Sequence, residues 1–280
     1  MSELPASQRL PDHSGDLTRG RLAAESVTVA YGSRTVLQDL SFTVPNGSLT
    51  MIIGPNGCGK STLLHTLARI LTPADGRVTL DGRDVRKLAA KGLARELALL
   101  PQSAITPVGV RVSAMVGRGR YPHQKLLQQW SETDETAVEA AMAATGITDL
   151  AGEFIDELSG GQRQRVWLAM LLAQETGIML LDEPTSYLDI AHQYELLELL
   201  RTQHDEGKTQ VVVLHDLDQA ARYASHLVVM DRGRIVTAGS PQEIITAELL
   251  RDVFGIEALV AADPVTGTPS VHPLDPRAAR

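Results

Sequence analysis

Short, largely apolar runs alternate along this chain with longer segments in which apolar residues recur at helical spacing. The runs are bounded by turn residues, which predicts buried strands at residues 50–53, 178–182, 211–215 and 227–230. The helical spacing predicts helices at residues 61–71, 132–145, 191–205 and 241–254. Strands and helices that alternate in this order indicate an α/β core.

Three regions depart from this alternation. Residues 24–30, 40–44 and 77–80, the last followed by an Asp-Gly turn, predict an antiparallel β subdomain. Residues 88–157 are alanine-rich and amphipathic, and they predict a helical insert. Beyond the helix expected at residues 241–254, the chain is polar and rich in proline, and we expect a tail there.

Composition narrows the class of protein. With 280 residues and 43% hydrophobic content, the chain can bury a substantial core. A formal net charge of −8 argues against a broad surface for nucleic acid. No apolar run approaches the ~18 residues that span a bilayer. Residues 1–21 are polar and lack the apolar stretch of a secretory signal, so we expect a flexible tail there and contact with a membrane only through a partner.

The first candidate for chemistry is a glycine-rich segment that fits the phosphate-binding pattern G-x-x-x-x-G-K-[ST]. It comprises Gly54, Pro55, Asn56, Gly57, Cys58, Gly59, Lys60, Ser61 and Thr62. It lies between an expected strand and an expected helix, so its backbone N–H groups and the helix N-terminus should form an anion site. Lys60 should reach the β- and γ-phosphates of a nucleoside triphosphate, and the Ser61 hydroxyl should ligate Mg²⁺.

Cys58 is the single cysteine, and it stands inside this segment. One cysteine cannot form an intramolecular disulfide, which is typical of a reducing compartment. Two interpretations are open: a thiol acidified by the helix N-terminus, or a small residue tolerated at a variable position. For normal function we favour the second.

Two carboxylates follow the apolar run at residues 178–181. In enzymes with this phosphate loop, an Asp at this place holds the Mg²⁺ shell, and Asp182 is the candidate. Glu183 is then placed to orient or deprotonate an attacking water molecule. Pro184 ends the strand.

A second glycine-rich element, Leu-Ser-Gly-Gly-Gln at residues 158–162, precedes another amphipathic segment. Ser159 is a good N-cap, but two glycines in a first turn cost about 1 kcal/mol each relative to alanine. A helix cap is one explanation. The other explanation is that the glycines allow close approach to a bulky anion. Because residues 54–62 already form the chain's own phosphate site, that anion would be held by another subunit.

These elements together resemble those of the ATP-binding-cassette (ABC) ATPases, whose signature is LSGGQ. The match runs from about residue 22 to residue 239, and it implies a P-loop NTPase (RecA-like) core with the β subdomain and helical insert described above. Less universal stretches resemble the ATPase subunits of bacterial ferric-siderophore importers, especially the ferric-enterobactin type. They are residues 119–124, 162–167, 187–190, 222–227 and 263–269. The expected organisation is therefore a tail at 1–21, an ATPase domain at 22–240 and a C-terminal extension at 241–280.

The resemblance assigns roles to four further residues. Tyr31 matches the aromatic residue that stacks on adenine, and Gln102 matches a glutamine that contacts Mg²⁺ or water. Asp189 matches an aspartate that crosses the dimer interface. His215, at the end of an expected strand, matches the histidine that hydrogen-bonds the γ-phosphate. The residues expected to act on ATP in trans, from a second copy, are Ser159, Gly160, Gly161, Gln162 and Asp189.

The expected function follows from the resemblance. Two copies would bind ATP head to tail, and a membrane permease, docked along residues 102–123, would convert closure into import of ferric siderophore. A substrate-binding protein would act indirectly, and the site of action would be the cytoplasmic face of the inner membrane. Ser113-Ala114 stands where such relatives often carry a polar residue and then Glu, which leaves the permease contacts near Ala114 open.

Three alternatives remain at this point. Haem, cobalamin and other metal-chelate importers use closely similar subunits. Soluble cassette proteins of repair or translation usually carry two cassettes or a long coiled coil, and this chain has neither. A regulatory module without turnover is the third, and the intact Glu183 and His215 argue against it.

Overall fold

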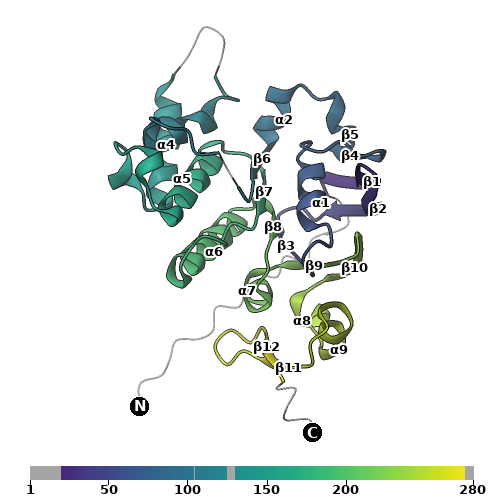
Figure 1. Cartoon of the computed structure of the whole chain (residues 1–280). Helices are drawn as coiled ribbons and strands as arrows, with labels where there is room; N and C mark the ends of the chain where they lie inside the picture. The colour runs from purple at the N-terminus through teal and green to yellow at the C-terminus, as the bar shows by residue number, and fades with distance from the viewer. Residues whose placement is uncertain (1–19, 104, 125–129, 275–280) are drawn as a thin grey trace, which may run out of the picture.

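The computed structural model describes residues 20–103, 105–124 and 130–274. The tail expected at residues 1–21 lies, up to residue 19, outside the described residues, as do the last six residues of the expected C-terminal tail. Figure 1 shows the helices and strands with the labels used below.

A six-stranded sheet forms the centre of the molecule, in the order β10-β9-β3-β8-β7-β6. Its strands are β3 (Leu49–Ile53), β6 (Leu97–Leu100), β7 (Ile178–Asp182), β8 (Thr209–Val213), β9 (His226–Asp231) and β10 (Arg234–Gly239). All neighbours pair in parallel except β9 with β10. Every residue of β3, β7 and β8 is buried, as expected for parallel strands covered on both faces. The expected α/β core is confirmed.

Two hydrophobic clusters cover opposite faces of this sheet. Neighbouring residues such as Met51 and Ile52 belong to different clusters, because successive side chains of a strand point to opposite faces. One face meets α1 (Lys60–Leu67) and the antiparallel sheet, and the other meets α6 (Ile190–Asp205) and α7 (Leu217–Tyr223). The loop before α1 therefore runs from the central sheet, at the end of β3, to the helix that covers one of its faces.

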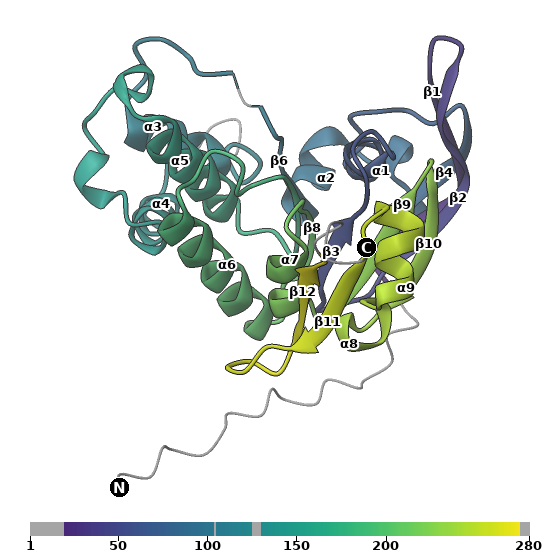
Figure 2. The same cartoon turned by 60° about the horizontal axis from the view of Figure 1, so that its bottom comes forward.

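The expected antiparallel subdomain is present as a four-stranded sheet in the order β2-β1-β4-β5. Its strands are β1 (Leu22–Tyr31), β2 (Arg34–Val44), β4 (Asp75–Leu80) and β5 (Arg83–Asp84). The strand expected at residues 40–44 begins earlier, because residues 34–37 already pair with β1. In Figure 2 this sheet lies on the opposite side of the core strands from the helical insert.

The helical insert consists of α3 (Val112–Gly117), α4 (Glu132–Ala144) and α5 (Gly160–Ala173), which contact one another. The expected range of 88–157 for this insert is wrong at both ends: α5 extends the insert to residue 173, and the first residues of that range belong elsewhere. Residues 90–96 form α2 (Ala90–Glu96), and residues 97–100 form β6, which pairs with β7 in the central sheet. Periodicity alone cannot separate a four-residue apolar run from part of a buried helix, and here the pairing with β7 decides for a strand.

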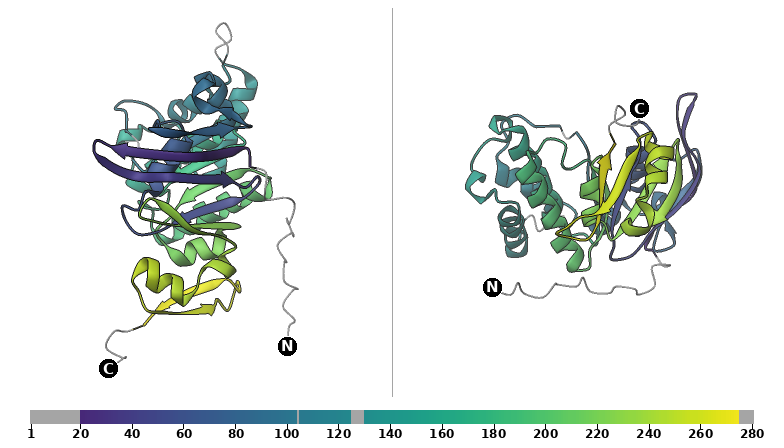
Figure 3. Two further views of the ribbon diagram at one scale, coloured as in Figure 1. Left: turned by 90° about the vertical axis from the view of Figure 1, so that its right-hand side faces the viewer. Right: turned by 90° about the horizontal axis from the view of Figure 1, so that it is seen from below.

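The C-terminal region also departs from expectation. The helix expected at residues 241–254 is broken into α8 (Pro241–Ile244), α9 (Ala247–Leu249) and a π-helical turn, because Thr246 caps a new helix through the N–H of Leu249. The expected tail instead forms a hairpin of β11 (Ala258–Ala262) and β12 (Pro269–Pro273). The Asp263 side chain stabilises the turn between them by accepting hydrogen bonds from two backbone N–H groups. Figure 3 shows these elements at one end of the molecule.

A buried ion pair holds the helical insert together. Arg120, 3% exposed, donates from Nε to Oδ1 of Asp134 at 2.8 Å and from Nη1 to the carbonyl oxygen of Ala173 at 2.8 Å. Burial alone would raise the pKa of Asp134, but hydrogen bonds from Arg120 and Ser131 outweigh it and lower that pKa below its usual value. The three segments of the insert therefore share one charged centre.

Arg120→Met is expected to lower the free energy of unfolding by about 3–5 kcal/mol at pH 7, because it leaves the Asp134 charge buried without its partner. A carboxylate with a lowered folded-state pKa stabilises fully above its unfolded pKa of about 4 and loses that contribution as pH falls further. The deficit should therefore shrink at about pH 3. Urea denaturation at pH 7 and at about pH 3 measures the loss in free energy of unfolding. The exposed Arg118→Met is the control. An equal deficit at both pH values would contradict the assignment.

Candidate nucleotide site

The loop at residues 54–59 joins β3 to α1, so the strand–loop–helix context expected from the sequence is present. Gly54 has φ +152°, and a Cβ there would lie 2.1 Å from the carbonyl oxygen of Met230. Gly59, at the start of α1, has φ +110°. Only glycine fits these two positions without strain, which explains the pattern locally.

Lys60 folds back into this loop. Its side chain is 5% exposed, and Nζ donates to the carbonyl oxygens of Gly54 at 2.8 Å and Pro55 at 3.2 Å. The ammonium group is thus held at the centre of the loop, on the first turn of α1. A phosphate brought there would meet a positive charge and the helix N-terminus together.

Ser61 and Asp182 supply oxygen ligands beside Lys60. The Ser61 hydroxyl donates to Oδ1 of Asp182 at 2.9 Å. Asp182 is 1% exposed, and its Oδ2 is buried without a hydrogen-bond partner. A buried carboxylate whose Oδ1 lies against a hydroxyl is a pair of hard oxygen donors that fits Mg²⁺, which takes few protein oxygens and completes its shell with water and phosphate. The described residues hold no group of three or more His, Cys, Asp or Glu side chains for a metal.

Glu183 is the meeting point of three side chains from different parts of the chain. Its Oε2 accepts from Nε2 of Gln102 at 2.6 Å and from the Ser186 hydroxyl at 3.1 Å, and its Oε1 forms a close contact with Nε2 of His215. The residue has φ +50°, a conformation that non-glycine residues rarely adopt and that is concentrated at functional sites. The structure therefore gathers Gln102, Glu183 and His215 as one group.

His215 differs slightly from its expected place. β8 ends at Val213, so His215 follows the strand by two residues instead of ending it. Its side chain is 45% exposed and reaches Glu183 from the loop before α7.

Ser186 is a site residue that the sequence analysis missed. Its only signal in the sequence was its place three residues after Glu183.

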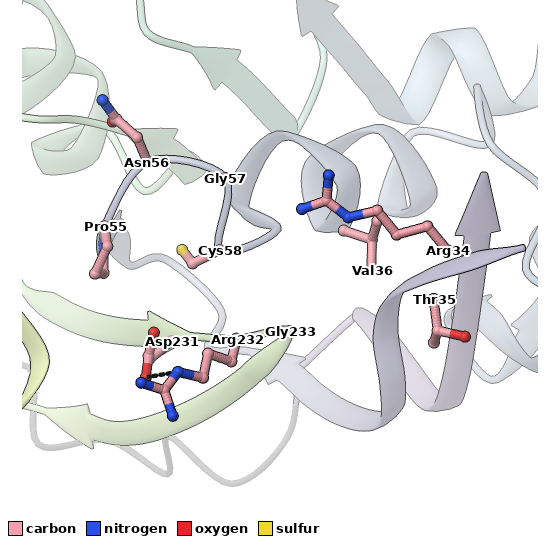
Figure 4. Close-up of a pocket in the computed structure, with 10 residues that line it drawn as sticks. All are labelled: Arg34, Thr35, Val36, Pro55, Asn56, Gly57, Cys58, Asp231, Arg232 and Gly233. Carbon is pink, nitrogen blue, oxygen red and sulfur yellow. Dashed lines mark ion pairs between the residues drawn. The ribbon is translucent and has the colours of Figure 1, made fainter.

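Cys58 is 5% exposed, and burial raises the pKa of its thiol. The acidified thiol considered for the helix N-terminus is therefore wrong, since burial outweighs the nearby positive charge of Lys60. Cys58 also borders a hollow of about 300 Å³ between the phosphate loop, the β1–β2 hairpin and the β9–β10 turn. Figure 4 shows Asn56 and Arg34 among the residues that line it.

A comparison with known protein families now decides the class. The family described as ABC transporter matches residues 37–186, which include the phosphate loop, the signature and the acidic pair. This chain belongs to the ABC transporter family. The fold and the nucleotide-binding ATPase class expected from the motifs are thereby confirmed.

Individual relatives of this ABC ATPase extend the match over most of the chain. It is 55% identical to the ferric enterobactin transport ATP-binding protein FepC of Escherichia coli K12, over 91% of this chain and 94% of that protein. It is 50% identical to YusV of Bacillus subtilis 168, an ATP-binding protein assigned to a siderophore transport system, over 90% of this chain and 92% of that protein. A cobalamin import ATP-binding protein, BtuD of Halobacterium salinarum, is 39% identical over 91% of this chain and 64% of that protein.

Solved structures agree with the fold of this ABC ATPase. An ABC transporter assigned to the metal-chelate type, solved in an inward-facing conformation, superposes with a TM-score of 0.77 at 27% identity, over 92% of this chain and 98% of that one. The dimeric bacterial ABC transporter cassette MJ0796 gives a TM-score of 0.71 at 25% identity, over 78% of this chain and 98% of that one. Among the described residues, no helix is both long and apolar enough to cross a membrane.

The signature segment of this ABC ATPase caps α5. Ser159 accepts from the N–H of Gln162 at 3.2 Å, and the Gln162 side chain accepts from the N–H of Ser159 at 2.9 Å, which forms a capping box. The cap explains Ser159 and Gln162 but neither glycine. A Cβ at Gly160 would meet nothing within 4 Å, one at Gly161 would make only ordinary contacts, and neither has a positive φ. Neither backbone conformation nor packing within this subunit therefore requires glycine at residues 160 and 161.

Two further expected residues, Asp189 and Tyr31, are exposed. Asp189 caps α6 by accepting from the N–H of His192 at 3.0 Å. Tyr31 ends β1 and is 52% exposed, so its ring is free to stack on a base. In the part of the chain that the structure describes, no hydrogen bond or ion pair joins Asp189 or residues 158–162 to the loop at residues 54–62.

Proposed function

We propose that this chain is the ATP-hydrolysing subunit of a bacterial importer of ferric siderophores. The single observation that carries the proposal is Glu183, held by Gln102 and His215 one residue after the buried Asp182. This arrangement provides a base, two groups that orient it and a metal ligand within one site. The high identity to FepC and YusV, over nearly the full length of all three chains, supports siderophore as cargo.

The reaction is attack of water on the γ-phosphorus of ATP. Lys60 would bind the β- and γ-phosphates, and Ser61 and Asp182 would hold Mg²⁺, which neutralises charge on the phosphate oxygens. Glu183 would take a proton from the attacking water molecule, whose position Gln102 helps to set. His215 would turn from Glu183 toward the γ-phosphate and donate a hydrogen bond to it.

A second copy of the chain would complete the site. The exposed N-terminus of α5 carries two glycines that its own subunit does not need, and such a helix end suits the γ-phosphate of a nucleotide bound to the partner. The exposed Asp189 would lie in the same interface. The dimeric cassette of similar fold supports the pairing of two copies, and in our proposal the pair is head to tail and forms on ATP.

A membrane permease would dock beside α3, at the cytoplasmic face of the inner membrane. Exposed apolar side chains gather along the expected segment of residues 102–123: Ile105 is 91%, Val108 84% and Tyr121 69% exposed. Ala114 is exposed on α3 and offers a small, uncharged contact there. A permease docked along this segment would cover these side chains. A substrate-binding protein would act on the far side of the permease.

Deletion of this chain is expected to abolish uptake of labelled ferric siderophore and to leave cobalamin and haem uptake unchanged. Complementation with the wild-type chain should restore uptake, and Glu183→Gln should not, because cargo would move only when ATP is turned over. This chain should also co-purify from membranes with an integral membrane protein, the proposed permease. Loss of cobalamin uptake alone would favour the cargo of the Halobacterium relative instead, and no co-purifying membrane protein would favour a non-transport ATPase.

A further inference from the structure

Helix α1 brings two polar side chains to the same buried carboxylate. Ser61 and His65 are four residues apart, so they lie one above the other on one face of the helix. The Ser61 hydroxyl donates to Oδ1 of Asp182 at 2.9 Å, and Nε2 of His65 lies 3.3 Å from Oδ2. The other histidine near the site, His215, contacts Glu183 instead.

The Oδ2 atom of Asp182 needs a donor. Asp182 is 1% exposed, and Oδ2 is buried without a formed hydrogen bond, which is costly for a carboxylate oxygen. Within the described residues, the His65 ring is the group at ion-pair distance from this atom. A small rotation of a side chain that is 28% exposed would align its N–H with Oδ2.

The contact between His65 and Asp182 would matter more if Ser61 and Asp182 held Mg²⁺. The Ser61 hydroxyl is the hydrogen-bond donor to the Asp182 carboxylate in the metal-free chain. If Ser61 ligated Mg²⁺, that hydrogen bond would be lost, and the carboxylate would be free to rotate. A donor on Oδ2 would then fix its plane and leave Oδ1 directed at the metal shell.

We propose that His65 is a positioning residue that orients Asp182 for Mg²⁺ through Nε2–H and Oδ2. The proposal rests on the proposed function, since it assumes that this site binds Mg²⁺ with ATP. The ring would act through the carboxylate and not on the nucleotide itself. The sequence signal was the spacing of four residues between Ser61 and His65, which places both on the side of α1 that faces β7.

A purely structural role for His65 is the competing explanation. Its carbonyl oxygen accepts from the N–H groups of Ile70 and Leu71 at 2.9 and 3.1 Å, which closes the end of α1. Any residue can supply that carbonyl group, so these bonds do not require an imidazole. The two explanations therefore separate when the side chain is changed and the backbone is kept.

The test measures binding of a fluorescent ATP analogue to the full-length chain, first in EDTA and then against Mg²⁺ concentration. His65→Leu should raise the Mg²⁺ concentration at half-maximal effect about tenfold, the size typical of losing a partner that orients a metal ligand. Its affinity in EDTA should be unchanged. His65→Gln, whose amide can reach Oδ2, should stay within about threefold of wild type, and His65→Asn, whose amide is too short, should behave like Leu.

The exposed His272→Leu on β12 is the matched control and should leave the Mg²⁺ dependence unchanged. Two results would overturn the proposal. One is a wild-type Mg²⁺ dependence for both Leu and Asn variants. The other is an equal loss of affinity in EDTA and in Mg²⁺, which would mean that the ring supports the loop and not the carboxylate. A wild-type chain that binds no ATP analogue at all would instead refute the proposed function.

Discussion

Glu183→Gln is expected to reduce ATP turnover at least about a hundredfold while ATP binding persists, because a positioned general base contributes about 10²–10⁴ in rate. The amide keeps the shape of the side chain but cannot accept the proton of the attacking water molecule. The partners Gln102 and His215 would remain in place around it. With hydrolysis blocked, the ATP-bound dimer should accumulate, and size-exclusion chromatography in ATP and Mg²⁺ should show it.

The exposed Glu248→Gln on α9 gives the matched control and should turn over ATP like wild type. Phosphate release measures turnover directly, and chromatography reports the assembly. Turnover within about threefold of wild type would remove Glu183 from the role of base, because so small a loss lies far below a general base's usual contribution. A variant that stays monomeric in excess ATP and Mg²⁺ would count against the ATP-dependent dimer.

Lys60→Ala should weaken ATP binding by at least about a hundredfold. Hydrogen bonds to charged groups are worth about 1.5–3 kcal/mol each, and Lys60 would make them to two phosphates. Its Nζ is already held in the loop by the carbonyl oxygens of Gly54 and Pro55, so little side-chain entropy is lost when ATP binds. Isothermal titration calorimetry measures the affinity.

Lys87→Ala provides the comparison for Lys60→Ala, since Lys87 is exposed on the turn after β5. This change should leave ATP affinity at the wild-type value. Unchanged affinity in Lys60→Ala itself would refute the assignment of the loop at residues 54–62 to the triphosphate. An equal loss in both variants would indicate a general effect of net charge.

Local pattern was enough to predict the phosphate loop and most of the core. The glycine spacing of residues 54–62 is a motif that can be recognised within one short segment, although the atoms that would clash with a Cβ at Gly54 and Gly59 belong to Met230 and Leu37, which are distant in sequence. β6 was missed because its four apolar residues become a strand only by pairing with β7, about 80 residues away. The β11–β12 hairpin was missed for a similar reason: its Val271 N–H bonds to Asp218 on α7, 53 residues earlier.

The resemblance placed the site residues around one nucleotide, but the direct contacts of Gln102 and His215 with Glu183 could not be predicted from the sequence. The phosphate loop, His215, Glu183 and Gln102 follow β3, β8, β7 and β6, which are neighbours in that order in the sheet. Carboxyl ends of parallel strands share one edge, so residues distant in sequence converge there. The contact of His65 with Asp182 could not be seen from spacing alone, since it also requires β7 to lie beside α1.

In the proposed function, ATP is hydrolysed between two copies of the chain, each with a phosphate loop and a signature. Asn56 and Ser159 are both exposed, one in each element, so each can be replaced by cysteine. Both changes are made in chains that also carry Cys58→Ala and Glu183→Gln, which removes the native thiol and blocks hydrolysis.

The decisive measurement is disulfide cross-linking of a mixture of the Asn56→Cys chain with the Ser159→Cys chain. A product of doubled mass should form in the mixture only when ATP is added, and neither chain should cross-link with itself, because the pair is head to tail. A chain with both changes should form disulfides with a second chain and none within itself. A cross-link within one chain, or a product that forms equally without ATP, would contradict the account.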